Sequence, residues 1–304
     1  MNPPSGRQIE LSHGAWSAVV VEVGGGLRAL SHHGVTLLDG YDADEMASGG
    51  RGQPLLPRPN RLAGATYEFA GRRLSAPVSE PSTGSAIHGL TRWMNWEVAE
   101  SAPDRCVMAL TLHPQPAYPF LLDLRLGYRL SDEGLEVTLG AVNAGSQSLP
   151  FGAGFHPYLT VGSATVDDAR LTLPADLWLP ADARAIPTGE RRAVDGERDL
   201  RGGGAIGDRV LDHCFTGLRR EGDGRARVRL EGPAGAVTLW MDDLWSHVMV
   251  FTGDTLAPGR RRRGLALEPM SCAPDAFNSG DGLRVLEPGE SVGGRWGITR
   301  EAAG

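Results

Sequence analysis

The sequence contains no lysine, so all 30 of its basic residues other than histidine are arginines. This absence excludes Schiff-base chemistry, a lysine-bound pyridoxal phosphate and the lysine of a P-loop. Cysteine is scarce as well, and Cys106, Cys214 and Cys272 form no short-range pairing pattern. We expect them to be free thiols in a reducing compartment, which predicts a cytoplasmic protein.

The sequence also lacks an excess of positive charge, since its formal net charge is -7. Phosphate binding requires a basic surface, so the charge argues against a nucleic-acid partner and does not suggest an anionic membrane surface. No apolar run approaches the length of a membrane span, and no basic segment followed by an apolar stretch opens the chain. We therefore expect neither a membrane nor a nucleic acid as a partner.

Several well-known catalytic and cofactor motifs are missing. The chain has no His-Glu-x-x-His, no Cys-x-x-Cys and no Gly-x-Ser-x-Gly. The glycines at 24–26 follow a strand-like segment, but no helix-forming segment follows them, which indicates a turn rather than a dinucleotide loop. We expect no metal and no organic cofactor.

Helical periodicity is nearly absent, whereas short alternating or apolar runs bounded by Gly, Pro, Asp or Asn recur along the chain. This pattern predicts an all-β sandwich or barrel, with 120–130 and 135–142 forming a hairpin. Segment 180–209 is polar and rich in turn residues, which predicts a long loop. No internal repeat or clean linker is visible, so we expect a single domain over residues 1–304. The other expected strands are 16–23, 34–38, 106–112, 226–230, 236–241, 247–251 and 295–298.

Two residues are the strongest candidates for chemistry. His156 lies in Phe155-His156-Pro157-Tyr158, and Glu268 lies in Leu267-Glu268-Pro269-Met270. A His and a Glu are suited to move protons to and from a sugar hydroxyl and a ring oxygen near neutral pH. Both lie in segments typical of strand ends and tight turns, where catalytic groups are often displayed. The alternative for a histidine in such an apolar run is a buried structural role.

Four further polar residues stand in turn-like or apolar surroundings. Prolines before Asn60 and Arg61 hold that segment extended, and an arginine presented in this way can clamp hydroxyls or a carboxylate. An ordinary salt bridge is the alternative for Arg61. His88 could equally make a structural hydrogen bond, and Asp212 could be a turn residue.

Aromatic and basic clusters leave two more alternatives open. Trp93, Trp96 and Trp245 could stack on the face of a pyranose ring, although tryptophans in a β domain more often belong to the core. We include Trp245 among the candidate binding residues. The arginine run 260–263 follows Pro258 and Gly259, which favours a solvated loop over an anion site.

Taken in order, seven segments resemble the aldose 1-epimerase (galactose mutarotase-like) family, bacterial subgroup. They cover the chain from about residue 50 to 280. They are PNRLAGATY (59–67), AIHG (86–89), GAGFHPY (152–158), IPTG (186–189), LDHCF (211–215), LEPM (267–270) and PDAFN (274–278).

The resemblance implies a large antiparallel β-sandwich that binds a small-molecule sugar in an open cleft, without metal or organic cofactor. By matching position, Glu268 is the catalytic base, His156 the catalytic acid and His88 a second active-site histidine. Arg61 and Asp212 hold sugar hydroxyls, with Asn60 beside them. The expected reaction opens and recloses the ring, with Glu268 ionised and His156 protonated. We expect a monomer or a homodimer.

The chain departs from the galactose mutarotases in the motif around His156, and this departure leaves the identity of the sugar open. These usually carry Asn-His-Ser/Thr-Tyr-Phe where this chain has Phe-His-Pro-Tyr-Leu (155–159). A free aldohexose is the expected substrate. One alternative is a hexose-6-phosphate mutarotase-like enzyme, with Arg58, Arg92 or the 260–263 run supplying the cationic groups. The other is a non-catalytic sugar-binding module, which the presence of both Glu268 and His156 disfavours.

Overall fold

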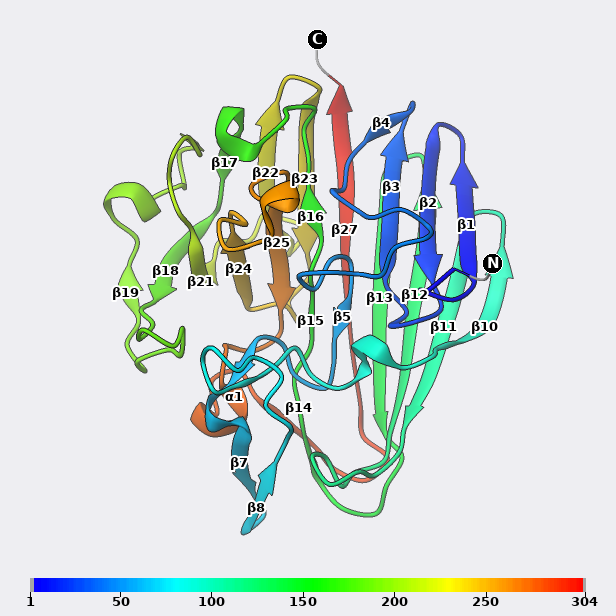
Figure 1. The fold of residues 1–304 in the computed structure, drawn as a ribbon, viewed down its shortest axis with the longest axis vertical. Coiled ribbons are helices and arrows are strands. Elements are labelled where there is room, and N and C mark those ends of the chain that lie inside the picture. The colour runs from blue at the N-terminus through cyan, green and yellow to red at the C-terminus, as the bar shows by residue number, and fades with distance from the viewer. Residues whose placement is uncertain (1–2, 303–304) are drawn as a thin grey trace.

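In the computed structural model, which describes residues 3–302, nearly every element is a β-strand in an antiparallel sheet (Figure 1). The predicted all-β class is confirmed, and so is the predicted hairpin. Its strands β12 (Leu122–Ser131) and β13 (Gly134–Asn143) pair along their whole length. Buried residues alternate with more exposed ones along β12, as expected for a strand with one face on a core.

A nine-stranded sheet is the largest layer, and its long central strands run side by side in Figure 1. In spatial order its strands are β10 (Glu97–Ala102), β11 (Arg105–Leu112), β12, β13, β27 (Ser291–Ala302), β23 (Gly235–Met241), β22 (Ala226–Gly232), β17 (Arg170–Thr172) and β20 (Gly204–Ala205).

A second large sheet carries the site described below. Its strands are β19 (Arg192–Ala193), β18 (Ala175–Leu179), β21 (Asp212–Leu218), β24 (His247–Phe251), β25 (Leu265–Met270), β15 (Gly154–Phe155) and β5 (Pro54–Leu55), with β16 (Tyr158–Leu159) also paired to β25. Along β25 every residue is buried, as expected for a central strand of the sheet.

Smaller elements complete the molecule. A four-stranded sheet consists of β1 (Gln8–His13), β2 (Trp16–Val21), β3 (Leu27–His32) and β4 (Val35–Thr36). The two-stranded pairs are β14 (Leu149–Phe151) with β26 (Arg284–Leu286), β6 (Arg61–Leu62) with β9 (Ala86–Ile87), and β7 (Thr66–Phe69) with β8 (Arg72–Ser75). The helices are α1 (Ala276–Ser279) and the 3₁₀ turns η1 (Ala63–Ala65), η2 (Thr91–Trp93), η3 (Val166–Asp168), η4 (Gly196–Arg198) and η5 (Pro258–Arg260).

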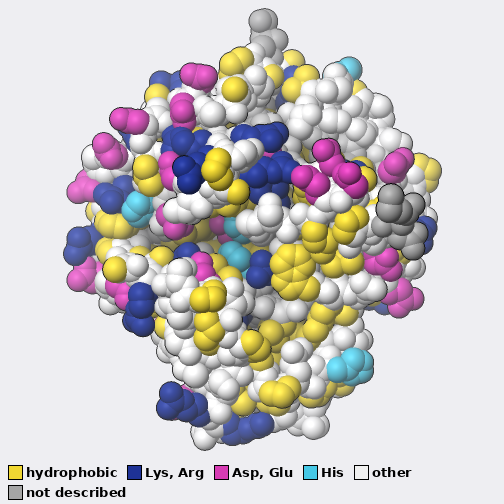
Figure 2. Space-filling model, in the orientation of Figure 1, with side chains coloured by type: hydrophobic (Ala, Val, Ile, Leu, Met, Phe, Trp, Pro, Cys, Tyr) yellow, Lys and Arg dark blue, Asp and Glu magenta, His cyan; other side chains and the backbone are white. Residues whose placement is uncertain are grey.

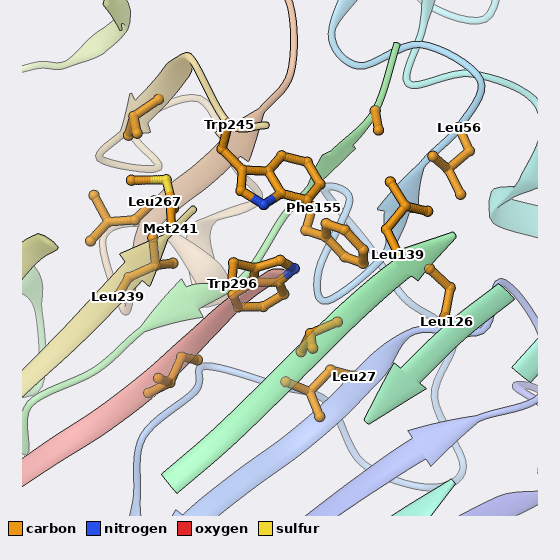
Figure 3. Close-up of a cluster of buried hydrophobic side chains, with 14 of the residues drawn as sticks. Leu27, Leu56, Leu126, Leu139, Phe155, Leu239, Met241, Trp245, Leu267 and Trp296 are labelled. Carbon is orange, nitrogen blue, oxygen red and sulfur yellow. The ribbon is translucent and has the colours of Figure 1, made fainter. Parts of the chain in front are cut away.

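The hydrophobic core fills the space between the two large sheets (Figure 3). Phe155 of β15 lies between two tryptophans. Its ring centroid is 5.6 Å from that of Trp245, which precedes β24, and 5.1 Å from that of Trp296 on β27. One cluster of buried side chains extends from Ile9 to Ile298. This shared core is why we propose a single domain for the whole chain.

The segment predicted as a long loop, 180–209, contains only the short elements β19, η4 and β20. The three glycines at 202–204 prevent a helix there, as expected. No helix within residues 3–302 has the length and apolar character that a membrane crossing requires.

Candidate active site

Strand register brings His156 and Glu268 together. Gly154 pairs with Met270 and Tyr158 pairs with Ala266, so the residue midway between them, His156, lies opposite Glu268. Pro157 and Pro269 follow the two residues, and neither proline has an N–H for the ladder. The pairing of β25 is accordingly divided between β15 and β16 at this level.

Alternation along the strands decides which side chains share a face with Glu268. Met249 of β24 pairs with Glu268 of β25, and Phe251 lies two residues after Met249 in β24. Asp212 pairs with Phe251, and Tyr158 is two residues from His156. Residues two apart in a strand point to one side of a sheet, so all these side chains face the cleft. Intervening residues such as Phe155 and Leu267 face the core.

Loops and short strands build the opposite wall of the cleft. The pairing of β6 with β9 sets Arg61 beside Ile87, so that Asn60 and His88 flank the same pair. The backbone N–H of His88 donates to the carbonyl of Asn60 over 2.9 Å. Both residues have positive φ, 51° and 62°, a conformation that asparagine and histidine adopt more readily than most residues. Such backbone strain is concentrated at functional sites.

The resulting cleft has a volume of about 310 Å³ and is open to solvent. The face of the molecule in Figure 2 is hollowed near its centre, where histidine, arginine and acidic side chains gather. The lining includes six of the predicted site residues: Asn60, Arg61, His88, His156, Asp212 and Glu268.

His156 and Glu268 form a buried pair at the floor of the cleft. Nε2 of His156 lies 3.2 Å from Oε1 of Glu268, and the two side chains are only 4% and 3% exposed. Burial, together with the positive charges of Arg92 and Arg51, lowers the pKa of His156 to about 3. Burial raises the pKa of Glu268 well above its usual value, and the negative charge of Asp212 adds to this rise.

These pKa directions correct the protonation expected from the sequence. The expected form, ionised Glu268 beside protonated His156, follows the ordinary order of the two pKa values. Desolvation disfavours both charges, so burial favours the neutral pair, in which Glu268 carries the proton. In either protonation state the pair offers one acid and one base.

Arg61 is held in place by Glu80. Its Nε and Nη2 donate to the two carboxylate oxygens of Glu80 over 2.7 and 2.9 Å, so the guanidinium is engaged as a fork. The salt bridge that was the alternative for Arg61 is therefore present, while the side chain also lines the cleft. Glu80 engages two of the five N–H donors of Arg61, which leaves both N–H groups of Nη1 and one of Nη2 for a ligand.

One sequence-based interpretation fails in the structure, and one alternative finds no support there. Trp245 is 0% exposed, packs on Phe155 and donates its indole N–H to the carbonyl of Arg295, so it belongs to the core and cannot stack on a sugar. The arginines at 260–263 are not in the cleft lining either. Arg260 and Arg262 instead form ion pairs with acidic residues of neighbouring segments.

The structure adds cleft residues that the motifs did not identify as functional. Arg92 was named only as one of several arginines that could contact a phosphate, and it lies in the lining. Tyr158 also lines the cleft, and its ring stacks on the His156 ring with centroids 4.8 Å apart. Its place two residues after His156 in a strand-like run was the available signal.

Comparison with known proteins gives a consistent result. A family model described as aldose 1-epimerase matches residues 7–299. The uncharacterized protein YihR of Escherichia coli (strain K12) is 34% identical over 94% of this chain and 91% of its own length. Human galactose mutarotase is 26% identical over 76% of this chain and 73% of its own.

Solved structures show the same fold. A homologue of aldose epimerase from C. elegans has a TM-score of 0.88 at 20% identity and covers 98% of this chain and 99% of its own. A galactose mutarotase-like protein from Clostridium acetobutylicum has a TM-score of 0.85 at 21% identity, covering 97% and 95%.

Proposed function

Because this chain belongs to the aldose 1-epimerase family, we propose that it interconverts the α and β anomers of a free aldohexose by acid/base ring opening and reclosure. The observation that carries the proposal is the contact of 3.2 Å between His156 and Glu268 at the floor of an open cleft. An acid and a base that are buried together and face a polar cleft suit a reaction that moves protons at two neighbouring oxygens.

In the proposed reaction one group of the pair removes the proton of the C1 hydroxyl while the other protonates the ring oxygen. The C1–ring oxygen bond breaks and leaves an aldehyde at C1. Rotation about C1–C2 presents the other carbonyl face, and the protons then return in the opposite sense. With the neutral pair, Glu268 is the acid and His156 the base in the opening step. Each positioned proton transfer contributes about 10²–10⁴-fold in rate.

Arg61, Asp212, His88 and Asn60 are the proposed groups for holding the sugar hydroxyls. Each lines the cleft, and together they offer donors and acceptors on both sides of the pair. Asp208, a neighbour that could have taken the place of Asp212, is not in the lining. Fixed polar groups of this kind discriminate between sugars, because a mismatched hydroxyl leaves one of them unpaired.

Polarimetry tests the reaction directly. Freshly dissolved α-glucose and α-galactose should reach their equilibrium rotation faster with the protein than without it. The His156→Ala protein serves as the control. An equal rate with and without the wild-type protein, for every aldose of a panel of free and phosphorylated sugars, would contradict the proposed reaction.

A second candidate function differs in its substrate, an aldose that carries an anionic substituent such as a 6-phosphate. The observation that favours it is Arg92, which lines the cleft and has no carboxylate partner among residues 3–302. Its hydrogen bonds to Gln53 and Ile87 are long, 3.5 and 3.4 Å, and its guanidinium lies 5.3 Å from the ring of the exposed Trp93. Arg92 therefore has donors to offer an anion, whereas the fork of Arg61 is occupied.

The two substrates are separated by comparing kcat/KM for glucose, galactose and glucose 6-phosphate. A preference for the phosphate of about tenfold, or about 1.4 kcal/mol of transition-state binding, favours the anionic aldose. Arg92→Gln should then remove the preference, because kcat/KM should fall much more for glucose 6-phosphate than for glucose. The control is Arg225→Gln, which removes an arginine that lies over Trp240 outside the cleft lining.

A further inference from the structure

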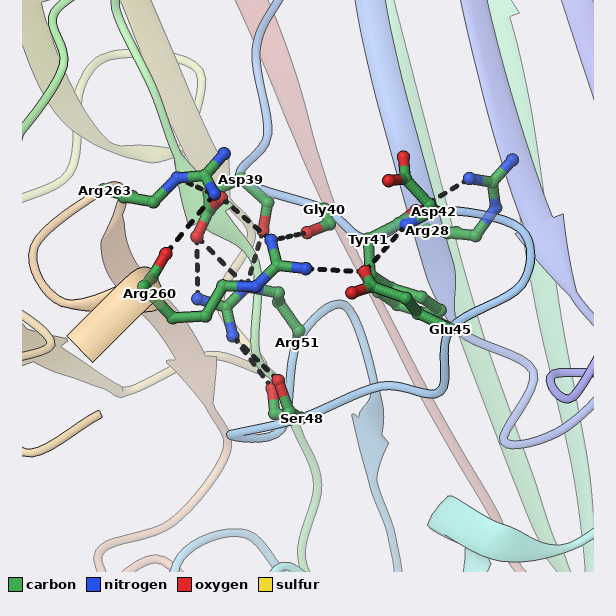
Figure 4. Close-up of polar contacts among 11 residues, drawn as sticks. Arg28, Asp39, Gly40, Tyr41, Asp42, Glu45, Ser48, Arg51, Arg260 and Arg263 are labelled. Carbon is green, nitrogen blue, oxygen red and sulfur yellow. Dashed lines mark hydrogen bonds and ion pairs between the residues drawn. The ribbon is translucent and has the colours of Figure 1, made fainter. Parts of the chain in front are cut away.

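Behind the cleft lies a buried ion pair that the proposed reaction does not use. Arg51 and Asp39 are each 2% exposed, and their closest contact is 2.7 Å (Figure 4). Nε of Arg51 donates to both the carbonyl and the carboxylate of Asp39, and Nη1 donates to the carbonyl of Ser48. Desolvating two charges is costly, so such a pair is weak evidence of a role in stability alone.

The Arg51 guanidinium connects this pair to the catalytic histidine through one aromatic ring. It lies 4.4 Å from the centroid of the Tyr158 ring. The Tyr158 ring stacks on the ring of His156 at an interplanar angle of 16°. The hydroxyl of Tyr158 donates to the carbonyl of Gly49 over 2.8 Å, which fixes the turn before Arg51. Gly50, in this turn, lies so close to His156 that a Cβ atom would be 2.5 Å from Cδ2 of the ring.

Packing contacts surround the imidazole on the sides that do not face Glu268. A functional histidine is usually oriented by a hydrogen bond at its second ring nitrogen. Nδ1 of His156 is buried and has no hydrogen-bond partner among the described residues. The ring is instead enclosed by the Tyr158 face, by Gly50 and by the edge of the His88 ring at 5.2 Å.

We propose that Arg51, fixed by Asp39, is a positioning residue for His156. Acting through the Tyr158 ring and the Gly49–Gly50 turn, it holds the imidazole so that Nε2 faces Glu268. The inference rests on the proposed function for its consequence in turnover, but the arrangement of the ring can be measured without activity.

The charge of Arg51 gives the proposal a pH signature. The charged or titratable groups that face His156 are Glu268, His88, Arg92, Arg51 and Tyr158. Arg51 opposes protonation of His156, so its removal should raise the pKa of His156 and move the acid limb of the kcat/KM profile to higher pH. A residue with a merely structural role would not shift that limb.

Two substitutions of Arg51 separate its charge from its shape. Arg51→Met removes both, so kcat should fall about 10- to 100-fold, with a smaller change in KM, and the acid limb should move up. Arg51→Lys keeps the charge but loses the planar fork, so kcat should fall without a shift of the limb. Arg225→Met, which removes the arginine over Trp240, is the matched control and should change neither.

Substitutions of Tyr158 keep the test decisive if the Arg51 variants do not fold. Tyr158→Phe retains the ring and should keep most of kcat, whereas Tyr158→Leu should lose it about as Arg51→Met does. Equal activity of the Phe and Leu variants, or a folded Arg51→Met protein with wild-type kcat and an unmoved acid limb, would overturn the proposal.

An NMR titration of the His156 ring proton in wild type and Arg51→Met does not depend on catalysis. An upward shift of the His156 pKa in the variant supports the electrostatic part of the proposal. Loss of the nuclear Overhauser contacts between the His156 and Tyr158 rings supports the positioning role, and unchanged contacts between the two rings contradict it. Absence of anomerisation by the wild-type protein would count against the proposed function alone.

Discussion

The two large sheets differ in continuity. The long strands of the nine-stranded sheet, such as β12 and β13, pair without interruption over ten residues each. In the second sheet β25 pairs with two short strands, β15 and β16, on either side of His156 and Pro157. Both sheets contribute to the core, but the candidate site lies where the ladder of the second sheet is interrupted. His156 thus lies where the backbone leaves its pairing, opposite Glu268, which stays paired with Met249 of β24.

The same contrast exists between adjacent residues. Phe155 and His156 point to opposite sides of the sheet, one into the core between two tryptophans and the other into the cleft beside Glu268. Substitutions on the cleft side should therefore affect turnover, and those on the core side should affect stability.

The largest effect should come from the catalytic pair. Glu268→Gln and His156→Ala each remove one of the two proton-transfer groups, so kcat should fall by about 10²–10⁴-fold while the fold is retained. Glu136→Gln, on the regular strand β13, is the matched control and should leave kcat unchanged. Near wild-type turnover by Glu268→Gln at saturating sugar would rule out the mechanism.

A core-side substitution should give the opposite result. Phe155→Ala leaves a cavity between Trp245 and Trp296, and we expect a loss of about 3–5 kcal/mol in the free energy of unfolding. Denaturant titration measures this loss. Activity per folded molecule should stay much closer to wild type than in His156→Ala, and a selective loss of activity without a loss of stability would contradict the division between the faces.

A smaller effect is expected from Asp212→Asn. The negative charge of Asp212 raises the pKa of Glu268, so its removal lowers that pKa and Glu268 loses its proton at a lower pH. The alkaline limb of the bell-shaped kcat/KM profile should therefore move to lower pH, although the two limbs belong to the His156–Glu268 pair as a whole. An unmoved alkaline limb would place Asp212 outside the electrostatic environment of Glu268.

The smallest expected effect is that of metal removal. Activity should survive exhaustive EDTA treatment and need no nucleotide, because the proposed steps use only side-chain acids and bases. Loss of activity on chelation, with recovery on adding a divalent ion, would contradict the acid–base scheme and indicate a metal-assisted reaction.

The sequence predicted the regular part of the fold well, because alternation in β12 and β13 reports one buried face directly. His156 and Glu268 could be selected by their motifs. Trp245 could not be assigned to the core, since it lies between strands, where no alternation shows which way a side chain points.

Properties that depend on tertiary contacts were beyond the sequence. The lowered pKa of His156 and the raised pKa of Glu268 follow from burial of both groups, which two separate motifs do not reveal. The place of Arg92 in the cleft and the stack of Arg51 on Tyr158 also depend on how distant segments meet.

The cross-strand position of His156 and Glu268 also has a kinetic consequence. The two residues are far apart in the chain and meet only when β25 has paired with β15 and β16. Contacts of such large sequence separation form slowly, because loop closure costs entropy before the contact is made. During refolding, anomerase activity should therefore return only with this pairing. The return of turnover would then report the closure of the second sheet, whereas circular dichroism reports the strands of both sheets together.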